Sequence, residues 1–168
     1  MSALIVTAEP GTADFAILDA LRQRHFPPER NHLSAHLTMF HALPPSAEAV
    51  ARRELARYAA AAPPPRAALA GLMNLGGGVA FRVVSDDLEA IRTGLADHFH
   101  GLLSAQDGSG WRPHVTIQNK VAPRDARILL EQLERDFRPR PLAIAALALH
   151  RYLGGPWERL ARYPFRGT

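Results

Sequence analysis

The chain has 168 residues, 47% of them hydrophobic and 21% charged, a composition typical of one globular domain that buries its own core. It contains no Cys, which excludes disulfides, thiolate nucleophiles and cysteine-based zinc sites, and no apolar run resembles a signal peptide or spans a bilayer, so we expect a cytoplasmic protein. The net charge is +4 and Lys120 is the only Lys among 20 basic residues; the many Arg side chains either suit a phosphate-bearing ligand or reflect composition alone.

In chain order, the first half alternates strands with helices. Apolar runs rich in β-branched residues indicate strands, and Pro, Gly or a capping residue marks the ends of the elements. The expected elements are a strand over 2–9, a helix over 13–25 capped by Thr12, a loop over 26–34, a strand over 35–43 and a helix from Ser46 to about 61.

The second half begins with a hairpin. The glycines at 76–78 separate two apolar runs and are typical of a turn; no GKS or GxGxxG pattern follows that would make them a phosphate-binding loop. The remaining expected elements are a helix capped by Asp86 or Asp87 that ends near 103, a loop over 104–113, a strand over 114–121, a helix from Pro123 to about 136 and a closing strand pair over 142–153 and 158–165.

This order predicts an α+β fold. Helices and strands alternate, but several links are hairpins, which favours antiparallel or mixed sheets over a doubly wound parallel sheet. A strand, a helix, a strand with a His-x-Thr triplet and a further helix occur twice in this order. We therefore expect a single domain over residues 1–168, built from two pseudo-symmetric lobes around a central cleft, each with an antiparallel or mixed sheet and flanking helices.

Each half contains one His-x-Thr triplet in an expected strand. His36 and Thr38 lie in "AHLTMF", and His114 and Thr116 lie in "PHVTIQ". Because alternate side chains of a strand share a face, each His is expected beside its Thr, while the apolar residues between them face the core. Two lobes that face each other would bring two imidazoles and two hydroxyls into one cleft.

Such a group of side chains has the chemistry of a phosphoester reaction. Near neutral pH a pair of imidazoles can hold one neutral base and one protonated acid. One His would take a proton from the attacking water or hydroxyl, and the other would give a proton to the leaving oxygen. The Thr hydroxyls would donate to the phosphate oxygens as charge develops there. This scheme requires neither a metal nor a cofactor.

The tetrapeptides HLTM and HVTI resemble the paired motifs of the 2H phosphoesterase superfamily, and "HLTMFHALP" and "RPHVTIQNKV" are similar to bacterial proteins of the 2'-5' RNA ligase family. The resemblance implies a bilobal fold whose motif strands face a central cleft. It also implies metal-independent action on 2',3'-cyclic phosphates or 2'-5' phosphodiester bonds of RNA ends or nucleotides, with His36 and His114 as acid and base. Thr38 and Thr116 would bind phosphate, and phosphodiesterase activity is favoured over reversible 2'-5' ligation.

Five further residues are candidates for substrate binding. Parity along the motif strands places Phe40 and Gln118 on the cleft face, where Phe40 could stack a base and Gln118 could bond to a base or a phosphate; either could instead fill the edge of the cleft. Arg24, Trp111 and Lys120 lie in or near loops that adjoin the motif strands. Ligand contacts are common in such loops, and ordinary loop charge or an anchoring aromatic is equally expected there.

Two other functions are open from the sequence. A non-catalytic RNA- or nucleotide-binding module would keep the cleft without turnover, and a Ser-His hydrolase would need a GxSxG elbow that the chain lacks. A metal site at His32 and His36 is disfavoured, because a loop-to-strand junction does not bring residues four apart onto one face. No heptad or long apolar stripe indicates a dimer, so we expect a monomer.

Overall fold

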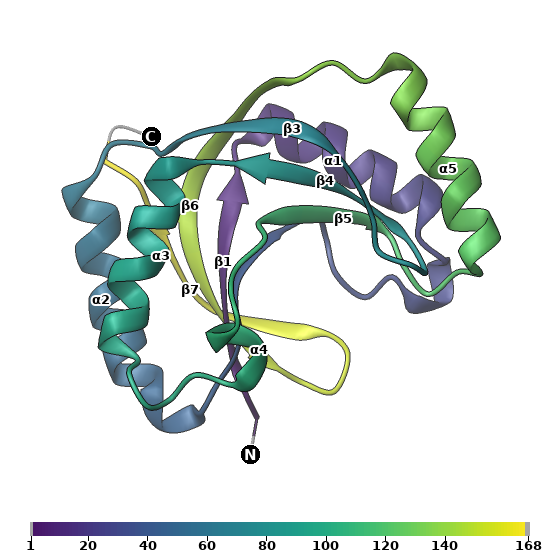
Figure 1. Ribbon diagram of the computed structural model, residues 1–168. Helices are drawn as coiled ribbons and strands as arrows, with labels where there is room; N and C mark the ends of the chain where they lie inside the picture. Colours follow the sequence, from purple (N-terminus) through teal and green to yellow (C-terminus); the bar gives the residue numbers. More distant parts are fainter. Residues whose placement is uncertain (1, 167–168) are drawn as a thin grey trace.

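The computed structural model describes residues 2–166. Its strands and longer helices follow the expected order, and a short helix over 105–108 lies within the segment expected as a loop over 104–113 (Figure 1). Within these residues the strands are β1 (Leu4–Pro10), β2 (Leu37–Leu43), β3 (Arg66–Asn74), β4 (Val79–Val84), β5 (His114–Gln118), β6 (Arg140–Tyr152) and β7 (Trp157–Pro164). The helices of the same part of the chain are α1 (Thr12–His25), α2 (Glu48–Ala61), α3 (Asp86–His98), α4 (Ala105–Gly108) and α5 (Pro123–Asp136), with short 3-10 turns η1 (Pro28–Arg30) and η2 (Pro45–Ala47).

The strands form one antiparallel sheet in the order β1-β2-β5-β4-β3-β6-β7. The long strand β6 pairs with β3 through residues 140–143 and with β1 through residues 144–151, so six of the strands close into a barrel, and β7 adds to β6. The expected α+β class with antiparallel strands is confirmed. The expectation of one sheet for each lobe is wrong, because β6 and the β2–β5 contact join the two halves into a continuous sheet.

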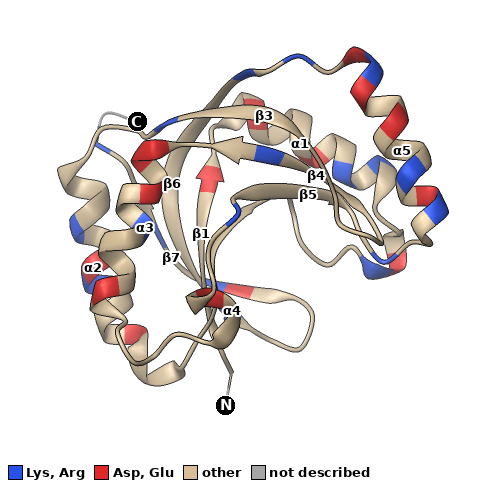
Figure 2. Cartoon of the chain, in the orientation of Figure 1, with Lys and Arg blue, Asp and Glu red and all other residues tan. Residues whose placement is uncertain are grey.

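The helices cover the barrel from two sides. α2 and α3 pack side by side and contact β3, β6 and β7, whereas α1 contacts β5 and α5 contacts β3 and β4 (Figure 1). Along α2 and α5, Arg is interspersed with Asp and Glu, a pattern typical of solvated helix faces (Figure 2). No helix within residues 2–166 has the length and hydropathy needed to cross a membrane.

The helix starts differ from the expected capping residues. Thr12 lies inside α1, whose N-cap is Gly11, and Ser46 lies inside the turn η2, so α2 begins two residues later than expected. Ser85 caps α3 in place of Asp86 or Asp87, because its hydroxyl accepts a hydrogen bond from the Leu88 amide (3.0 Å) and satisfies a free N–H of the first turn. The Asp side chains then supply negative charge to that turn.

The glycines at the β3–β4 turn are structural, as expected. Gly76 has a φ of +88°, a left-handed conformation that favours glycine, and its amide donates to the Asn74 side chain (2.8 Å). A Cβ on Gly78 would lie 1.9 Å from the carbonyl oxygen of Gln118. The turn therefore needs glycine because the end of β5 passes directly against it.

Candidate active site

The two motif strands are neighbours in the sheet. β2 and β5 pair antiparallel at Leu37 and Val115, both fully buried. Antiparallel register then places His36 across from Thr116 and Thr38 across from His114. These four side chains are half-buried, in alternation with buried apolar residues. The structure therefore brings both His-x-Thr pairs onto one shared patch of the sheet.

Both motif imidazoles are held in the same way. Nδ1 of His36 lies 2.7 Å from the carbonyl oxygen of Ser34, and Nδ1 of His114 lies 2.7 Å from that of Arg112. A carbonyl oxygen can only accept, so each Nδ1 carries the proton in these bonds. Each ring is thus left with Nε2 as its second nitrogen, which accepts a hydrogen bond in a neutral ring and donates one in a protonated ring.

The environment of His36 favours its neutral form. Burial lowers the pKa of His36 to about 4, with further lowering from the charges of Arg22, His150 and His114, and this outweighs the opposing hydrogen bond to Ser34. The indole of Trp157, on β7, contributes to this environment, with its ring centroid 4.7 Å from that of the His36 imidazole. His36 is therefore uncharged at neutral pH and able to accept a proton.

Two side chains from outside the sheet each donate a hydrogen bond to the backbone of one motif strand. Arg22 of α1 donates from Nη1 to the carbonyl oxygen of Thr116 (3.1 Å), and Trp111 donates from Nε1 to that of Thr38 (2.9 Å). Arg22, which precedes the first motif, thus bonds to the threonine of the second motif, and Trp111, which precedes the second motif, bonds to the threonine of the first. Because β2 and β5 share only one paired position, these donors satisfy backbone groups next to it. The sequence identified Trp111 as a candidate but missed Arg22, which is 4% exposed on a helix.

Both motif strands shift register by one residue directly after the threonine. Against β1, Thr38 pairs with Thr7 but Phe40 pairs with Val6; against β4, Thr116 pairs with Ala80 but Gln118 pairs with Val79. An extra residue in one strand reverses the alternation of side chains beyond it. The faces expected from strict parity therefore hold up to each threonine and fail after it.

These register shifts change the positions expected for Phe40 and Gln118. Phe40 is fully buried and packs edge-on against Phe99 (centroids 5.3 Å apart), so its expected position on the cleft face is wrong. Gln118 is 7% exposed, and its Oε1 has no hydrogen-bond partner within the described residues. His41, beyond the shift in β2, lines a pocket together with Thr38 instead.

Arg24 and Lys120 are not brought to the motif residues. Both are exposed, and neither lines the pockets that contain His36 or His114. Lys120 follows β5 with a φ of +64°, and its amide donates to the Asn119 side chain, so it forms part of a turn beside the β3–β4 hairpin. Their predicted contact with substrate has no support from their positions.

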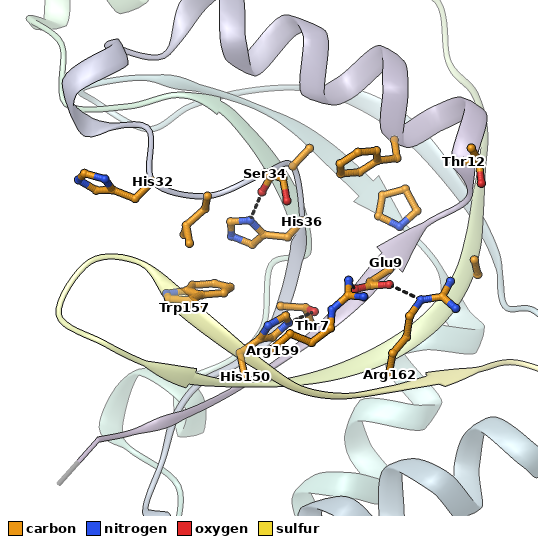
Figure 3. A pocket seen from close by; sticks show the side chains of 15 residues that line it. Thr7, Glu9, Thr12, His32, Ser34, His36, His150, Trp157, Arg159 and Arg162 are labelled. Atoms are coloured by element: carbon orange, nitrogen blue, oxygen red, sulfur yellow. Dashed lines mark hydrogen bonds and ion pairs between the residues drawn. The ribbon is translucent and has the colours of Figure 1, made fainter.

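Two pockets lie along the motif strands, one at each imidazole. The first has a volume of about 420 Å³ and contains His36; opposite this ring stand Trp157, His150 and Arg159 from the last two strands (Figure 3). The second, of about 510 Å³, contains Thr38 and His114 and is closed by the 106–112 segment. A substrate with its phosphate at the motif residues could extend into either pocket.

The wall of the second pocket is fixed by a buried carboxylate. Asp107 accepts hydrogen bonds from the amides of His41 (2.8 Å) and Ala42 (3.0 Å) and from Nδ1 of His41 (3.0 Å). Burial raises the pKa of Asp107, but these hydrogen bonds together lower it below its usual value. Asp107 therefore stays ionised and ties the loop that carries Trp111 to β2. Among the described residues no cluster of three or more His, Cys, Asp or Glu could hold a metal ion.

Solved structures of other proteins share this fold. TT0787 of Thermus thermophilus superposes with a TM-score of 0.69 at 18% identity over 100% of both chains. E. coli LigT superposes with a TM-score of 0.58 and 16% identity in its complex with 3'-AMP, and of 0.61 and 17% identity in its complex with NADP+, each over 98% of both chains. At these identities the likeness concerns the fold, which is that of a LigT-like α+β protein.

The family follows from the sequence itself. The chain matches the 2'-5' RNA ligase superfamily over residues 9–156, and it belongs to that superfamily. No protein in a set of curated sequences matches it. The family resemblance expected from the two motifs is therefore confirmed.

Proposed function

We propose that this protein is a phosphodiesterase that opens 2',3'-cyclic phosphates or cleaves 2'-5' phosphodiester bonds of RNA ends or nucleotides, with His36 and His114 as its general base and acid. One observation carries the proposal. The pairing of Leu37 with Val115 places two imidazoles and two threonines on one patch, with both Nε2 atoms available for proton transfer.

The proposed step is an in-line displacement at phosphorus. A water oxygen bonds to the phosphorus and loses a proton to one Nε2, while the bond to the 2' or 3' oxygen breaks and that oxygen receives a proton from the other Nε2. The hydroxyls of Thr38 and Thr116 donate to the non-bridging oxygens, which carry the developing charge. With a ribose hydroxyl in place of water, the same displacement forms a phosphodiester and acts as a ligation.

We assign the base to His36. Its low pKa, about 4, keeps the ring neutral at pH 7, so it can take the proton of the nucleophile, and this leaves proton donation to His114. The Arg22 guanidinium, which lowers that pKa, is also the group that fixes the Thr116 carbonyl.

The solved relatives support a nucleotide ligand. E. coli LigT has been crystallised with 3'-AMP, with NADP+ and with ATP, the last with a TM-score of 0.51 to this chain. A 3'-nucleotide is the type of product that opening a 2',3'-cyclic phosphate would release. We therefore take nucleotides and RNA ends as the substrate class.

The test is a panel of substrates assayed in EDTA. The purified protein is incubated with 2',3'-cyclic mononucleotides, with 2'-5' and 3'-5' dinucleotides and with RNA bearing a 2',3'-cyclic end, and products are separated by chromatography. We expect turnover of the cyclic phosphates or the 2'-5' bonds, and a loss of about 10²- to 10⁴-fold in kcat for His36→Ala and for His114→Ala.

The matched control is His100→Ala, which removes an exposed imidazole that lines neither motif pocket. It should retain wild-type kcat. Full activity of both motif variants would refute the assignment. Binding of nucleotides without turnover of any substrate would instead identify a non-catalytic nucleotide-binding module.

A further inference from the structure

The face of β7 that looks onto His36 carries two arginines in addition to Trp157. His150 pairs with Arg159 but Leu149 pairs with Ala161, so Leu160 is an extra residue in β7. This shift reverses the alternation of side chains, and Arg162, not Ala161, joins the face of Arg159. Both arginines line the pocket that contains His36 (Figure 3).

The two guanidinium groups share one carboxylate. Arg159 and Arg162 both pair with Glu9 of β1, Arg162 through Nε at 2.7 Å. Glu9 is 16% exposed in its side chain, whereas the side chains of Arg159 and Arg162 are 53% and 40% exposed. The cluster therefore keeps one unit of positive charge in excess, with guanidinium N–H groups open to the pocket and no second acid to neutralise them among its lining residues.

The positive charge of Arg159 lowers the pKa of a neighbouring imidazole in the same pocket, that of His150. His150 lines this pocket, hydrogen-bonded with the Thr7 hydroxyl (2.9 Å), with its ring centroid 5.3 Å from that of Trp157. Burial and then the charge of Arg159 lower the pKa of His150 to about 4, against the effect of Glu9. His150 is therefore neutral at pH 7, and the arginines are the source of the excess charge.

Trp157 provides an aromatic surface in the same pocket as these arginines and His36. The Trp157 indole contacts both His36 and His150, and Arg159 follows it by two residues along the strand, about 7 Å in an extended chain. A nucleoside stacked on Trp157 would thus have both the motif residue His36 and the arginines within the same pocket, where each could bind one of its phosphates. Aromatic rings bind nucleosides by stacking without regard to sequence.

We propose that Arg159 and Arg162 form a second phosphate subsite, so that the preferred substrate is a nucleotide that carries a further phosphate besides the phosphodiester at the histidines. This inference rests on the proposed function for the position of the first phosphate. The further phosphate is the 5'-phosphate of the same nucleotide or the next phosphodiester of a chain; bidentate contacts from guanidinium groups suit either one.

The test compares binding of ligands that differ in one phosphate. Dissociation constants of 3'-AMP, of adenosine 3',5'-bisphosphate and of the dinucleotide ApAp, which has a chain phosphodiester but no 5'-phosphate, are measured by calorimetry at constant ionic strength. We expect the wild type to bind the bisphosphate about tenfold more tightly than 3'-AMP. Arg159→Gln and Arg162→Gln should abolish most of this preference, because they should weaken binding of the bisphosphate more than binding of 3'-AMP. The dinucleotide distinguishes a 5'-phosphate from a chain phosphodiester.

Two variants control for unspecific effects. Arg151→Gln removes an arginine of β6 that pairs with Glu48 and Glu158 and does not line the pocket, so it should leave the preference intact. Arg162→Lys retains the charge and should keep a larger preference than Arg162→Gln. Equal affinity of the wild type for 3'-AMP and the bisphosphate would overturn the subsite, as would an equal loss of preference in Arg151→Gln.

The binding assay also separates the two proposals. Preference for the bisphosphate without turnover of any diester would establish the subsite and reject the phosphodiesterase. Turnover of cyclic nucleotides with the same kcat/KM whether or not they carry a 5'-phosphate, together with equal binding, would retain the phosphodiesterase and reject the subsite.

Discussion

Arg22 donates a hydrogen bond to the Thr116 carbonyl across a gap of 94 positions in the chain, and thereby fixes the second motif strand from the first helix. Burial lowers the pKa of Arg22 to about 10, so the guanidinium stays charged at neutral pH. It also bonds to the Asn31 side chain (2.8 Å) and lies over the ring of Phe26. These contacts make Arg22 a positioning residue for the site.

Arg22→Met should therefore lower both stability and kcat. The variant leaves the Thr116 carbonyl and the Asn31 side chain without their buried donor, at a cost of about 1 to 3 kcal/mol in unfolding free energy by urea titration. Because the substrate contacts remain, we expect kcat to fall more than KM rises. Arg127→Met, an exposed arginine on α5, is the control and should change stability by less than about 0.5 kcal/mol. An unchanged kcat in a folded Arg22→Met protein would mean that the bond is only structural.

Trp157→Ala should raise the pKa of His36. Burial is the main cause of the value of about 4, and the indole lies against this ring, so its removal admits water and favours the charged form. The measurement is an NMR titration of the His36 ring in both proteins. We expect a shift toward the ordinary value of about 6.5 and a matching upward shift of the acid limb of kcat/KM. Identical titration curves would show that Trp157 does not shield the ring.

Stability should fall when the pH drops from 6.5 to 4. His36 and His150 both have folded-state pKa values of about 4, below their unfolded values, so the unfolded chain binds more protons in this window. Each imidazole then costs on the order of 2 to 3 kcal/mol of unfolding free energy over the window. Urea titrations at several pH values measure the slope, and His150→Gln, which cannot titrate, should reduce it. A slope unchanged by that variant would contradict the buried, neutral state of His150.

Asp107→Ala should loosen the wall of the second pocket. The variant removes the acceptor of two β2 amides and of the His41 ring, and buried donors without a partner cost at least about 2 kcal/mol. The loop that carries Trp111 would lose its anchor on β2, so amide hydrogen exchange in residues 104–112 should accelerate. Glu29→Ala, an exposed acid in η1, is the control and should alter neither quantity. Unchanged exchange in the 104–112 loop would show that other contacts hold it.

Gly78→Ala should destabilise the β3–β4 turn far more than an ordinary glycine substitution. Its Cβ would meet the Gln118 carbonyl at 1.9 Å, so either β4 or the end of β5 must move. We expect a loss of more than about 2 kcal/mol in unfolding free energy. Gly108→Ala, in α4 with open space around it, gives the matched control and should be neutral or slightly stabilising. A mild effect at Gly78 would indicate that the strands yield easily there.

The order of elements and the two motif pairs could be predicted because they depend on short-range patterns. Alternation in "HLTM" and "HVTI" correctly separates the polar residues from the buried Leu37 and Val115. The prediction failed one residue further along, at Phe40, because a shift in strand register leaves no mark in a run of apolar residues. Where a strand contains an extra residue, strict alternation predicts the wrong face of the sheet for the side chains that follow it.

Long-range contacts set the rest of the site and were not predictable. Arg22 lies four residues after the buried Leu18, on the inner face of α1, but its hydrogen bond to β5 depends on the approach of that strand. The pocket arginines Arg159 and Arg162 have an odd and an even position in one strand, so strict alternation places them on opposite faces. Their common face depends on the extra residue Leu160. The sequence therefore predicted the neighbouring positions of the two motif pairs more readily than the residues that surround them.

The strand β6 contributes both to the closure of the barrel and to the pocket around His36. Its first residues seal the ring against β3, and its last residues lead into the strand that covers His36 with Trp157. Proteolytic cleavage within β6 would therefore both open the barrel and expose the His36 imidazole to solvent. We therefore expect a chain cleaved in β6 to lose its activity altogether, and not to yield active fragments with altered selectivity.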